Sequence, residues 1–439
     1  MTSHVRHFVL TGDGRIREFS AELAARVAGG ASPMPEFADA CVRYLQLTLD
    51  DEAETETEIR IQSAGASIRF DAEGRLLEAG PAKPEEQISG FEHDAVVQWV
   101  LRDRPQPRDG GGDLLKDAST SVAGLRLSFI DSLSSLAADD WDTLFEGYSP
   151  FVRYAYLAAL ERYGCVGSET GWRPFHLIAT DDTGQLVGAV PLYLKAHSYG
   201  EFVFDFGWAD ASRRLGEPYY PKLLNAIPFT PSVGPRIGAV SAAVRTVLVD
   251  TLKQQLNELG VSSVHGLFAA DTDASAFADS GWLQRTDLQF QWFNQGDTDF
   301  AGFVSRLAGD KRKKILRERR RVAEAGIHFE CRPGDALSES EWMSVYALYA
   351  NTYEERGQAP YLTPEFLLDY GGTAGTPMRV ILAYEGPRLV AAALTLQAGD
   401  TLYGRHWGAA DHYHSLHFEC CYYQGIELCL RQGLQRYDA

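Results

Sequence analysis

The chain has 439 residues, of which 45% are hydrophobic and 23% charged, and its formal net charge is −19. This length exceeds one ordinary hydrophobic core, so we expect a soluble globular protein of two or three domains. Strong negative charge argues against wrapping duplex DNA over the whole surface, although a local basic groove stays open. No segment approaches the roughly 20 apolar residues that cross a bilayer, and the start lacks the apolar core of a signal peptide. We therefore expect a cytoplasmic protein without a membrane span.

The six cysteines are scattered through the chain without the spacing of a disulfide framework. Their pattern is typical of reduced thiols in the cytoplasm. His412, His414 and His417, followed by Cys420 and Cys421, are candidate metal ligands. Their spacing matches no standard zinc pattern, so we predict no metal site.

Residues 1–104 are predicted to form a small α+β domain that shows no catalytic constellation, and its function stays unassigned. Short alternating runs predict strands, and apolar residues at helical spacing predict helices. The expected strands are residues 7–11, 58–62, 66–70 and 75–78, and the expected helices are residues 20–27 and 91–101, whereas 37–48 has helical spacing and 42–49 is equally consistent with a strand.

Residues 105–119 are rich in Pro and Gly and are predicted to be a linker. Beyond the linker, the order of elements occurs twice, which indicates an internal repeat of a whole mixed α/β domain. The first copy is residues 120–296, a basic helical connector is 297–326, and the second copy is 327–439. We expect the two copies to superpose, each with a central sheet splayed near its middle. Because only five residues follow the helix expected at 416–434, we predict missing terminal strands and an exposed edge near Tyr437.

The densest mixture of aromatic, ionisable, Gly and Pro residues lies between positions 193 and 238. On an extended segment, His197, Tyr199, Glu201 and Asp205 would point to one side. Such groups can transfer protons and form hydrogen bonds. Charged side chains are costly to bury without partners or water. We therefore predict a cleft lined by His197, Tyr199, Glu201 and Lys222 that faces the second copy near Tyr403 and Arg405.

Several long motifs stand out within residues 120–439. They are residues 171–175, 197–205, 219–222, 229–231, 234–236, 403–408, 416–419 and 422–427. These motifs are similar to the FemAB-like family of peptidoglycan biosynthesis/recognition proteins. The paired arrangement also resembles Fem-type aminoacyl transferases, and each copy resembles the GNAT acyltransferase fold. The resemblance excludes the N-terminal module.

This resemblance implies tandem GNAT-like domains in a bacterial transferase. The implied activity is transfer of an acyl or aminoacyl group to an amine acceptor, with a small molecule or a peptidoglycan precursor as acceptor. The alternative is a catalytically inactive module that recognises a peptide or glycan in the cleft between the domains. Binding of an acyl donor distinguishes the two.

Two donors are consistent with the resemblance, acyl-coenzyme A and aminoacyl-tRNA, and no further cofactor is implied. GNAT domains hold pyrophosphate at a helix N-terminus, where Gly234, Arg236 and Gly238 stand in this chain. An ordinary strand-to-helix turn is the alternative. The expected tRNA phosphate contacts lie in the connector, where the alternative is a solvated helical face. They are Lys311, Arg312, Lys313, Lys314 and Arg317.

Acyl transfer to an amine requires a base and donors for the oxyanion. Glu201, His197 and Asp205 are the candidate bases, and Tyr199 joins them as a candidate catalytic residue. The alternative is that Glu201 and Asp205 pair with Lys222 or Arg236 and brace the fold. For His417 and Glu419 the alternative role is favourable charge and capping at a helix start. The expected substrate-binding residues are Tyr219, Tyr220, Lys222, Tyr403, Arg405, Trp407, His417 and Glu419.

Overall fold

The computed structural model describes most of the chain, with side chains described from residue 124 onward. The chain divides into two compact units, residues 1–89 with 214–216, and residues 90–213 with 217–439. The described residues are 4–11, 16–19, 41–49, 58–63, 66–71, 76–81, 91–101, 120–122, 124–145, 147, 149–203 and 205–439.

The first unit contains two three-stranded antiparallel sheets among its described residues. The predicted hairpin of residues 58–62 and 66–70 is confirmed, and so is the strand alternative for residues 42–49. The helix expected at residues 20–27 lies outside the described residues. The strands are β1 (His4–Thr11), β2 (Ile16–Phe19), β3 (Cys41–Leu49), β4 (Glu58–Ser63), β5 (Ala66–Asp71) and β6 (Leu76–Pro81).

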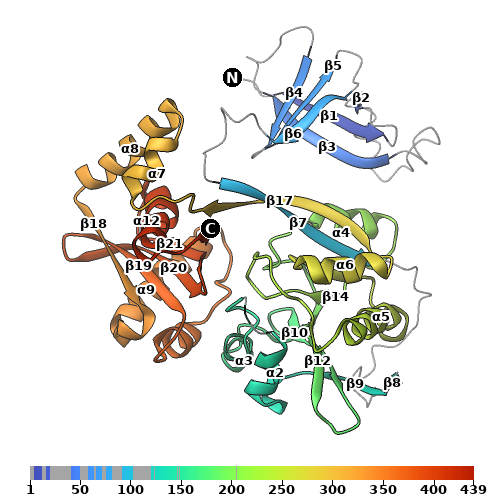
Figure 1. Cartoon of the computed structure of the whole chain (residues 1–439). Helices are drawn as coiled ribbons and strands as arrows, with labels where there is room; N and C mark the ends of the chain where they lie inside the picture. Colours follow the sequence, from blue (N-terminus) through green and yellow to red (C-terminus); the bar gives the residue numbers. More distant parts are fainter. Residues whose placement is uncertain are drawn as a thin grey trace. The chain divides into compact units, whose positions relative to one another are not determined.

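The helix predicted at residues 91–101 is wrong, because this segment is the strand β7 (Phe91–Leu101). Ala95, Val97 and Trp99 occur at every second position, which is the strand period rather than the helical one. In the second unit β7 lies antiparallel to β17 (Leu283–Phe293), and Figure 1 shows the two long strands side by side.

The split predicted near the middle of each sheet is found in the first half of the second unit, whereas the strands of the second half follow one another without a break. One part has the strand order β15-β12-β11-β9-β8, and the other begins β10-β13-β14-β16-β7-β17. The chain crosses between the parts at residues 191 and 192, where β12 ends and β13 begins. The strands are β8 (Thr120–Val122), β9 (Leu125–Ile130), β10 (Trp172–Pro174), β11 (His176–Thr180), β12 (Leu186–Val190), β13 (Tyr193–Lys195), β14 (Lys222–Asn225), β15 (Gly238–Ala239) and β16 (Val264–Leu267).

Helix α5 (Ala242–Leu259) packs on the first part of this sheet. The Ser241 hydroxyl accepts from the Val244 amide at its start, and Gly260 ends it with a left-handed φ of 64°. Leu248 and Leu252 on its inner face are fully buried. The other helices of this half are α2 (Ala138–Leu144), α3 (Tyr154–Arg162), α4 (Phe206–Arg214) and α6 (Asp271–Asp279).

The second half repeats the order of strand, two helices, antiparallel hairpin, and a strand–helix–parallel strand crossover. The crossover β14–α5–β16 of the first half corresponds to β21–α12–β22 of the second. The predicted mixed α/β class is confirmed. The elements are β18 (Ile327–Pro333), α9 (Glu339–Glu354), α10 (Pro364–Phe366), η4 (Leu367–Gly371), β19 (Met378–Glu385), β20 (Arg388–Ala398), β21 (Thr401–Ala409), α11 (Leu416–Phe418), η5 (Glu419–Tyr423), α12 (Gln424–Gln432) and β22 (Arg436–Asp438), where η4 and η5 are π-helical turns.

The exposed edge predicted near Tyr437 is wrong. Strand β22 pairs with β21 on one side and with β17 on the other. Tyr437 is only 1% exposed. Because β17 is eleven residues long, it pairs with β7 along most of its length and with β22 at its C-terminal end. One hydrogen-bonded sheet of eleven strands therefore runs through both halves.

A shared hydrophobic core also joins the halves. It includes Phe151 and Tyr156 from the first half and Tyr349, Phe366 and Tyr403 from the second. The connector consists of α7 (Phe300–Arg306) and α8 (Gly309–Glu324). Among the described residues, no helix combines the length and the apolar character that crossing a membrane requires.

Candidate functional site

Lys222 is the centre of a buried charged cluster at the start of β14. Its Nζ donates to Ser198 Oγ at 2.8 Å, to Glu201 Oε2 at 2.8 Å and to Asp205 Oδ2 at 2.7 Å. The side chains of Lys222 and Glu201 are 0% exposed and that of Asp205 is 1% exposed. An ammonium group has three donors, and all three are used here. Lys222 therefore holds both carboxylates in place, and it has no donor left for an oxyanion in this conformation.

Two tyrosines complete this Lys222 cluster. Tyr219 donates from its hydroxyl to Asp205 Oδ2 at 2.7 Å, and the Tyr220 hydroxyl lies 2.7 Å from Ser198 Oγ. Within the described part of the chain, Glu201 Oε1 and Asp205 Oδ1 have no hydrogen-bond partner. Buried carboxylate oxygens rarely stay unpaired. These two atoms are therefore the free acceptors of the cluster.

The two carboxyl groups of the cluster have pKa values shifted in opposite directions. Burial raises the pKa of Glu201, and the opposing charge of Lys222 only partly offsets this effect. Burial also acts to raise the pKa of Asp205, but the charge and hydrogen bond of Lys222 outweigh it and lower the net value. Lys222 itself has a raised pKa, because the two carboxylates overcome the effect of burial. Glu201 is therefore the member of the pair that takes up a proton more readily.

The extended segment expected at residues 197–205 is wrong. Strand β13 ends at Lys195, and Gly200 and Phe202 have φ values of 79° and 57°. These left-handed residues reverse the chain direction, so the alternation of a strand is lost. Tyr199 is consequently 49% exposed, whereas Glu201 is buried. A Cβ at position 200 would lie 2.7 Å from the Phe229 ring, so the glycine allows close approach of that ring.

His197 and Tyr199 lie outside the hydrogen-bonded cluster. The Tyr199 amide donates to His197 Nδ1 at 3.3 Å, and the Tyr199 carbonyl accepts from Trp172 Nε1 at 2.9 Å. Burial lowers the pKa of His197, and the charge of Lys195 acts in the same direction. The structure thus brings Glu201, Asp205 and Lys222 together and leaves these two predicted residues at the periphery.

Lys195 is a buried residue of this region that sequence reasoning missed. It is the register partner of Lys222 in the pairing of β13 with β14. Its Nζ lies 3.6 Å from the centroid of the Trp172 ring and donates to the Tyr199 carbonyl at 3.3 Å. Burial lowers the pKa of Lys195 to about 6. A lysine inside an otherwise apolar strand was the available signal.

The turn predicted to hold pyrophosphate is occupied by the protein itself. Arg236 is 1% exposed and donates to the carbonyls of Leu267 at 2.7 Å, Ser232 at 2.5 Å and Pro235 at 3.1 Å. The Asp273 carboxylate accepts the Arg236 amide at 2.7 Å. Burial lowers the pKa of Arg236 to about 9. This geometry matches the alternative of a strand-to-helix turn.

Gly234 and Gly238 serve the same turn. Gly234 forms an isolated bridge with Ala269. A Cβ at Gly238 would lie 2.8 Å from the side chains of Leu144 and Phe145. Gly238 is therefore explained by close packing within the first half, and a donor site at this turn stays a prediction.

The predicted open cleft near Tyr403 and Arg405 is wrong, because Glu201 and Lys222 are buried and Tyr403 is only 2% exposed. Tyr403 packs on Phe151 with ring centroids 5.4 Å apart. The Arg405 guanidinium pairs with Asp438 at 3.0 Å, and both side chains are at most 3% exposed. The second half instead contacts residues 193–238 through Tyr361, whose ring stacks on that of Phe229 with centroids 4.8 Å apart.

The other predicted residues of the second half lie around η5. Glu419 is buried, and its Oε1 accepts from Arg319 Nε at 3.1 Å. Burial raises the pKa of Glu419 against the charge of Arg319. Glu419 thus ties η5 to α8, which is more than the capping role considered from sequence. The rings of Trp407 and His417 lie 5.3 Å apart beside it.

The basic residues of α8 differ in their surroundings. Arg312 donates to the Ser305 carbonyl at 2.7 Å and the Leu307 carbonyl at 3.1 Å, so it caps the end of α7. Lys314 pairs with Glu318 at 3.8 Å. The predicted phosphate contact stays a prediction, and Lys311 is half-buried whereas Lys313, Lys314 and Arg317 are exposed.

No group of three His, Cys, Asp or Glu side chains that could hold a metal ion occurs among the described residues. Cys420 is fully buried, and burial raises its thiol pKa well above the usual value.

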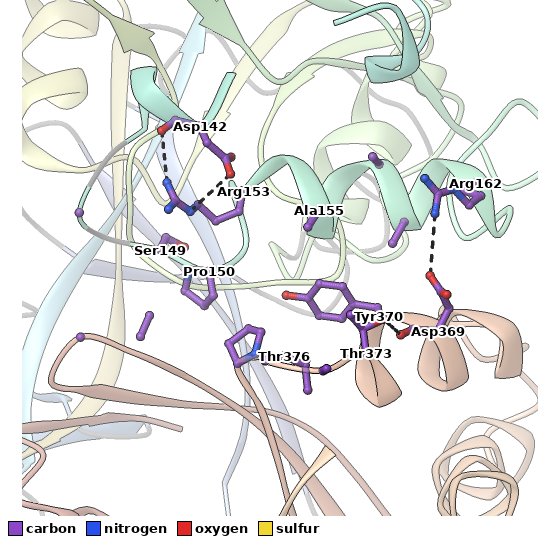
Figure 2. Close-up of a pocket in the computed structure, with 18 residues that line it drawn as sticks. Asp142, Ser149, Pro150, Arg153, Ala155, Arg162, Asp369, Tyr370, Thr373 and Thr376 are labelled. Atoms are coloured by element: carbon purple, nitrogen blue, oxygen red, sulfur yellow. Dashed lines mark hydrogen bonds and ion pairs between the residues drawn. The ribbon is translucent and has the colours of Figure 1, made fainter. Parts of the chain in front are cut away.

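A pocket of about 800 Å³ lies apart from all residues predicted from sequence. It is bounded by α3 of the first half and by the segment from η4 to β19 of the second, as Figure 2 shows. The available sequence signal was the helical spacing of Ala155, Ala158 and Ala159 between Arg153 and Arg162.

Comparison with known proteins gave one family match. A family model, FemAB_like, described as peptidoglycan biosynthesis/recognition, matches residues 132–439. No curated protein matches the chain.

Solved structures showed weaker similarity. The C-terminal domain of a protein classed as a lysylphosphatidylglycerol synthetase from Agrobacterium fabrum has a TM-score of 0.41 at 10% identity, covering 69% of this chain and 77% of that chain. L-PGS from Bacillus licheniformis has a TM-score of 0.37 at 10% identity, covering 64% and 73%. A glucosamine N-acetyltransferase region of a fungal GH3 β-N-acetylglucosaminidase has a TM-score of 0.26 at 14% identity, covering 73% and 36%. Scores below 0.5 do not establish a shared fold, so a functional conclusion rests on the family match and the site geometry.

Proposed function

Because this chain belongs to the FemAB-like family of peptidoglycan biosynthesis/recognition proteins, we propose that it transfers an acyl or aminoacyl group to an amine. The acceptor is a peptidoglycan precursor or a related amine. The donor is an acyl-coenzyme A or an aminoacyl-tRNA. Family membership supports the peptidoglycan connection, and the Lys222 cluster supports the chemistry.

The observation that carries the proposal is the free Glu201 Oε1 beside a lysine that fixes the rest of the carboxylate. An amine that attacks an acyl carbonyl forms the new C–N bond and loses a proton, while the leaving group departs with the electron pair of the broken acyl bond. Glu201 takes that proton, since burial raises its pKa above the usual value of a carboxyl group. Lys222 and Tyr219 act as positioning residues, because their donors are already used within the cluster.

Access to Glu201 requires movement of the loop formed by residues 196–205. Glu201 is buried, whereas Tyr199 and Phe202 on the same loop are 49% and 42% exposed. Displacing these two exposed aromatic side chains opens the cluster from the solvent side. The left-handed Gly200 between them allows the turn.

A second candidate function is recognition without catalysis. It is favoured by the complete use of the Lys222 donors and by the inward-facing Arg236. In that case Glu201 and Asp205 brace the loop, and the protein binds a peptidoglycan fragment without changing it.

The substitution Glu201→Gln separates the two functions. The purified chain is incubated with acyl-coenzymes or charged tRNA and muropeptides, and the amide product is measured by mass spectrometry. For a transferase, we expect Glu201→Gln to lower the rate by about 100-fold or more while the free energy of unfolding changes little. For a brace, the same change lowers the unfolding free energy by about 1–3 kcal/mol and affects binding only through folding.

Asp297→Asn is the matched control, because the Asp297 side chain is only 8% exposed and its Oδ1 also accepts from a cation, Arg306 Nε, at 2.9 Å. It is expected to lower stability and leave transfer by the folded protein intact. A Glu201→Gln protein that is both stable and fully active would contradict the transferase and the brace alike.

A further inference from the structure

We propose that the pocket beside α3 binds a short zwitterionic peptide of small residues, with its carboxylate at Arg153 and its ammonium group at Asp369. The site is separate from the Lys222 cluster. It depends on the proposed function only for how the bound peptide is used, as an acceptor or as a recognised ligand.

Small side chains make up much of the pocket wall. Ala155, Ala158 and Ala159 line it from α3, at the i, i+3, i+4 spacing of one helical face. The opposite wall consists of the segment from Thr373 to Pro377 and the turn at Ala398 and Gly399. With a volume of about 800 Å³, the pocket accommodates a short extended backbone with small side chains.

Charged side chains lie at both ends of the helix. Figure 2 shows Arg153 and Asp142 at one end of α3 and Arg162 with Asp369 at the other. Arg153 Nε lies 3.8 Å from Asp142 Oδ2, and Arg162 Nη1 lies 3.9 Å from Asp369 Oδ2. All four side chains are at least 30% exposed. Both pairs are loose enough for a ligand to compete with them.

The direction of the ligand follows from the helix dipole. The N-terminal end of a helix favours an anion, and the C-terminal end favours a cation. Asp142 Oδ1 is held by the Tyr154 amide at 2.7 Å, and Arg153 Nη1 donates to the Asp142 carbonyl at 3.2 Å. Among the described residues, none accepts from Arg153 Nη2. This nitrogen is therefore available for a carboxylate.

At the other end, the Asp369 carboxylate lies near the C-terminus of α3. Its only charged neighbour among the described residues is Arg162, and that pair is at the limit of an ion-pair contact. An ammonium group would replace Arg162 beside Asp369. The two arginines of α3 are therefore expected to act in opposite directions on the same ligand.

The length of the helix sets the length of the peptide. Arg162 follows Arg153 by nine positions, which corresponds to about 14 Å along the axis. An extended chain rises about 3.3–3.6 Å per residue, so about four residues span this distance.

The net charge of −19 disfavours a polyanion but not a neutral zwitterion. The π-turn η4, which contributes Asp369 and Tyr370 to the wall, is a kind of helical distortion frequent at functional sites.

Calorimetric titration of the full chain with tetra-alanine tests the inference. Tetra-alanine with free termini is compared with its N-acetylated form, its C-terminal amide and coenzyme A. We expect the free peptide to bind, and blocking either end to weaken binding about tenfold or more. Arg153→Gln should weaken the free peptide to the level of the amide, with no further loss when both changes are combined. Asp369→Asn should weaken binding of the free peptide to the level of the N-acetylated peptide, with no further loss when both changes are combined.

Arg162→Gln is the matched control, because it removes the same charge from the same helix. It should leave binding unchanged or strengthen it, since Asp369 then loses its competitor. Ala158→Phe should abolish binding by filling the pocket, with its melting temperature measured alongside. The exposed Arg153→Gln and Asp369→Asn variants keep the test decisive if that variant fails to fold.

The inference is overturned if tetra-alanine does not bind at up to about 10 mM. It is equally overturned if the doubly blocked peptide binds as well as the free one, or if only coenzyme A binds in an Arg153-dependent way. Glu201→Gln should bind tetra-alanine like the unchanged chain. Binding without any transfer activity would therefore contradict the proposed transferase and leave this site standing.

Discussion

Lys195 and Lys222 are register partners on neighbouring strands, yet their surroundings shift their pKa values in opposite directions. Lys222 has two carboxylates within 2.8 Å, and its pKa is raised. Lys195 faces an indole ring and one carbonyl oxygen, and burial lowers its pKa to about 6. A buried amine without an anionic partner is more easily kept neutral than charged. The arrangement assigns the single positive charge of the pair to Lys222.

This difference gives a pH dependence of stability. Between pH 6 and pH 10.5 the unfolded state holds a proton on Lys195 that the folded state lacks, so stability rises with pH across this window. One such group contributes a slope of up to about 1.4 kcal/mol per pH unit. Lys195→Met should remove this slope and stabilise the protein at pH 7. Urea unfolding between pH 6.5 and 9 measures it, and an unchanged slope in the variant would show that Lys195 is charged when folded.

Gly200 supports a second prediction at the residue scale. Its φ of 79° is strained for other residues, and an added Cβ would meet the Phe229 ring at 2.7 Å. Gly200→Ala should therefore lower the unfolding free energy by about 2–4 kcal/mol. Gly184→Ala is the control, since Gly184 has a φ of 85° and nothing within 4 Å. It should cost only about 1 kcal/mol, and equal losses in both variants would mean that the Phe229 ring moves aside.

At the scale of elements, the three residues of β22 complete the large sheet. Strand β22 lies between β17 and β21, and the Tyr437 ring fills the space left by Gly404 and Gly425. A Cβ on Gly404 would lie 2.7 Å from the Tyr437 hydroxyl oxygen, and a Cβ on Gly425 would overlap the ring. Although short, β22 therefore covers the edges of β17 and β21 and holds the Tyr437 side chain in the core.

Removing residues 436–439 should consequently destabilise the protein and promote association. The exposed edges of β17 and β21 become available for pairing with another chain. We expect a lower melting temperature and a shift to larger species in size-exclusion chromatography. Removal of Ala439 alone, which is exposed, is the control and should change neither. A monomeric truncated chain of unchanged melting temperature would contradict the assigned role of β22.

At the scale of the second unit, the repeated halves are joined by one eleven-stranded sheet and one shared core. Phe151 and Tyr156 of the first half pack against Tyr403 and Phe366 of the second. Ser232 of the first half donates at 3.0 Å to Asp438 of the second, which forms a buried ion pair with Arg405 of its own half. Such an interface couples the halves in unfolding.

We therefore expect the second unit to unfold in a single step. Leu248→Ala, in the first-half core, and Leu382→Ala, on β19, each remove a side chain that is at most 1% exposed. Each change should cost about 2–5 kcal/mol and shift the same calorimetric transition as a whole. If each variant shifted only a separate part of the heat-absorption profile, the halves would be independent domains.

The sequence by itself determined the mixed α/β class, the repeated order of elements and the family, because hydrophobic period and turn residues are local properties. It also indicated the chemical types around Lys222, including the alternative that Glu201 and Asp205 pair with this lysine.

The local sequence pattern did not reveal where the loop of residues 196–205 turns, since the left-handed Phe202 is held by contacts distant in sequence. It also gave no sign that β17 would cover β22, or that α3 and η4 would enclose a pocket, because these contacts join residues more than 140 positions apart. Only the tertiary structure decided which polar groups are buried together, because burial depends on the packing of the whole second unit rather than on neighbours along the chain.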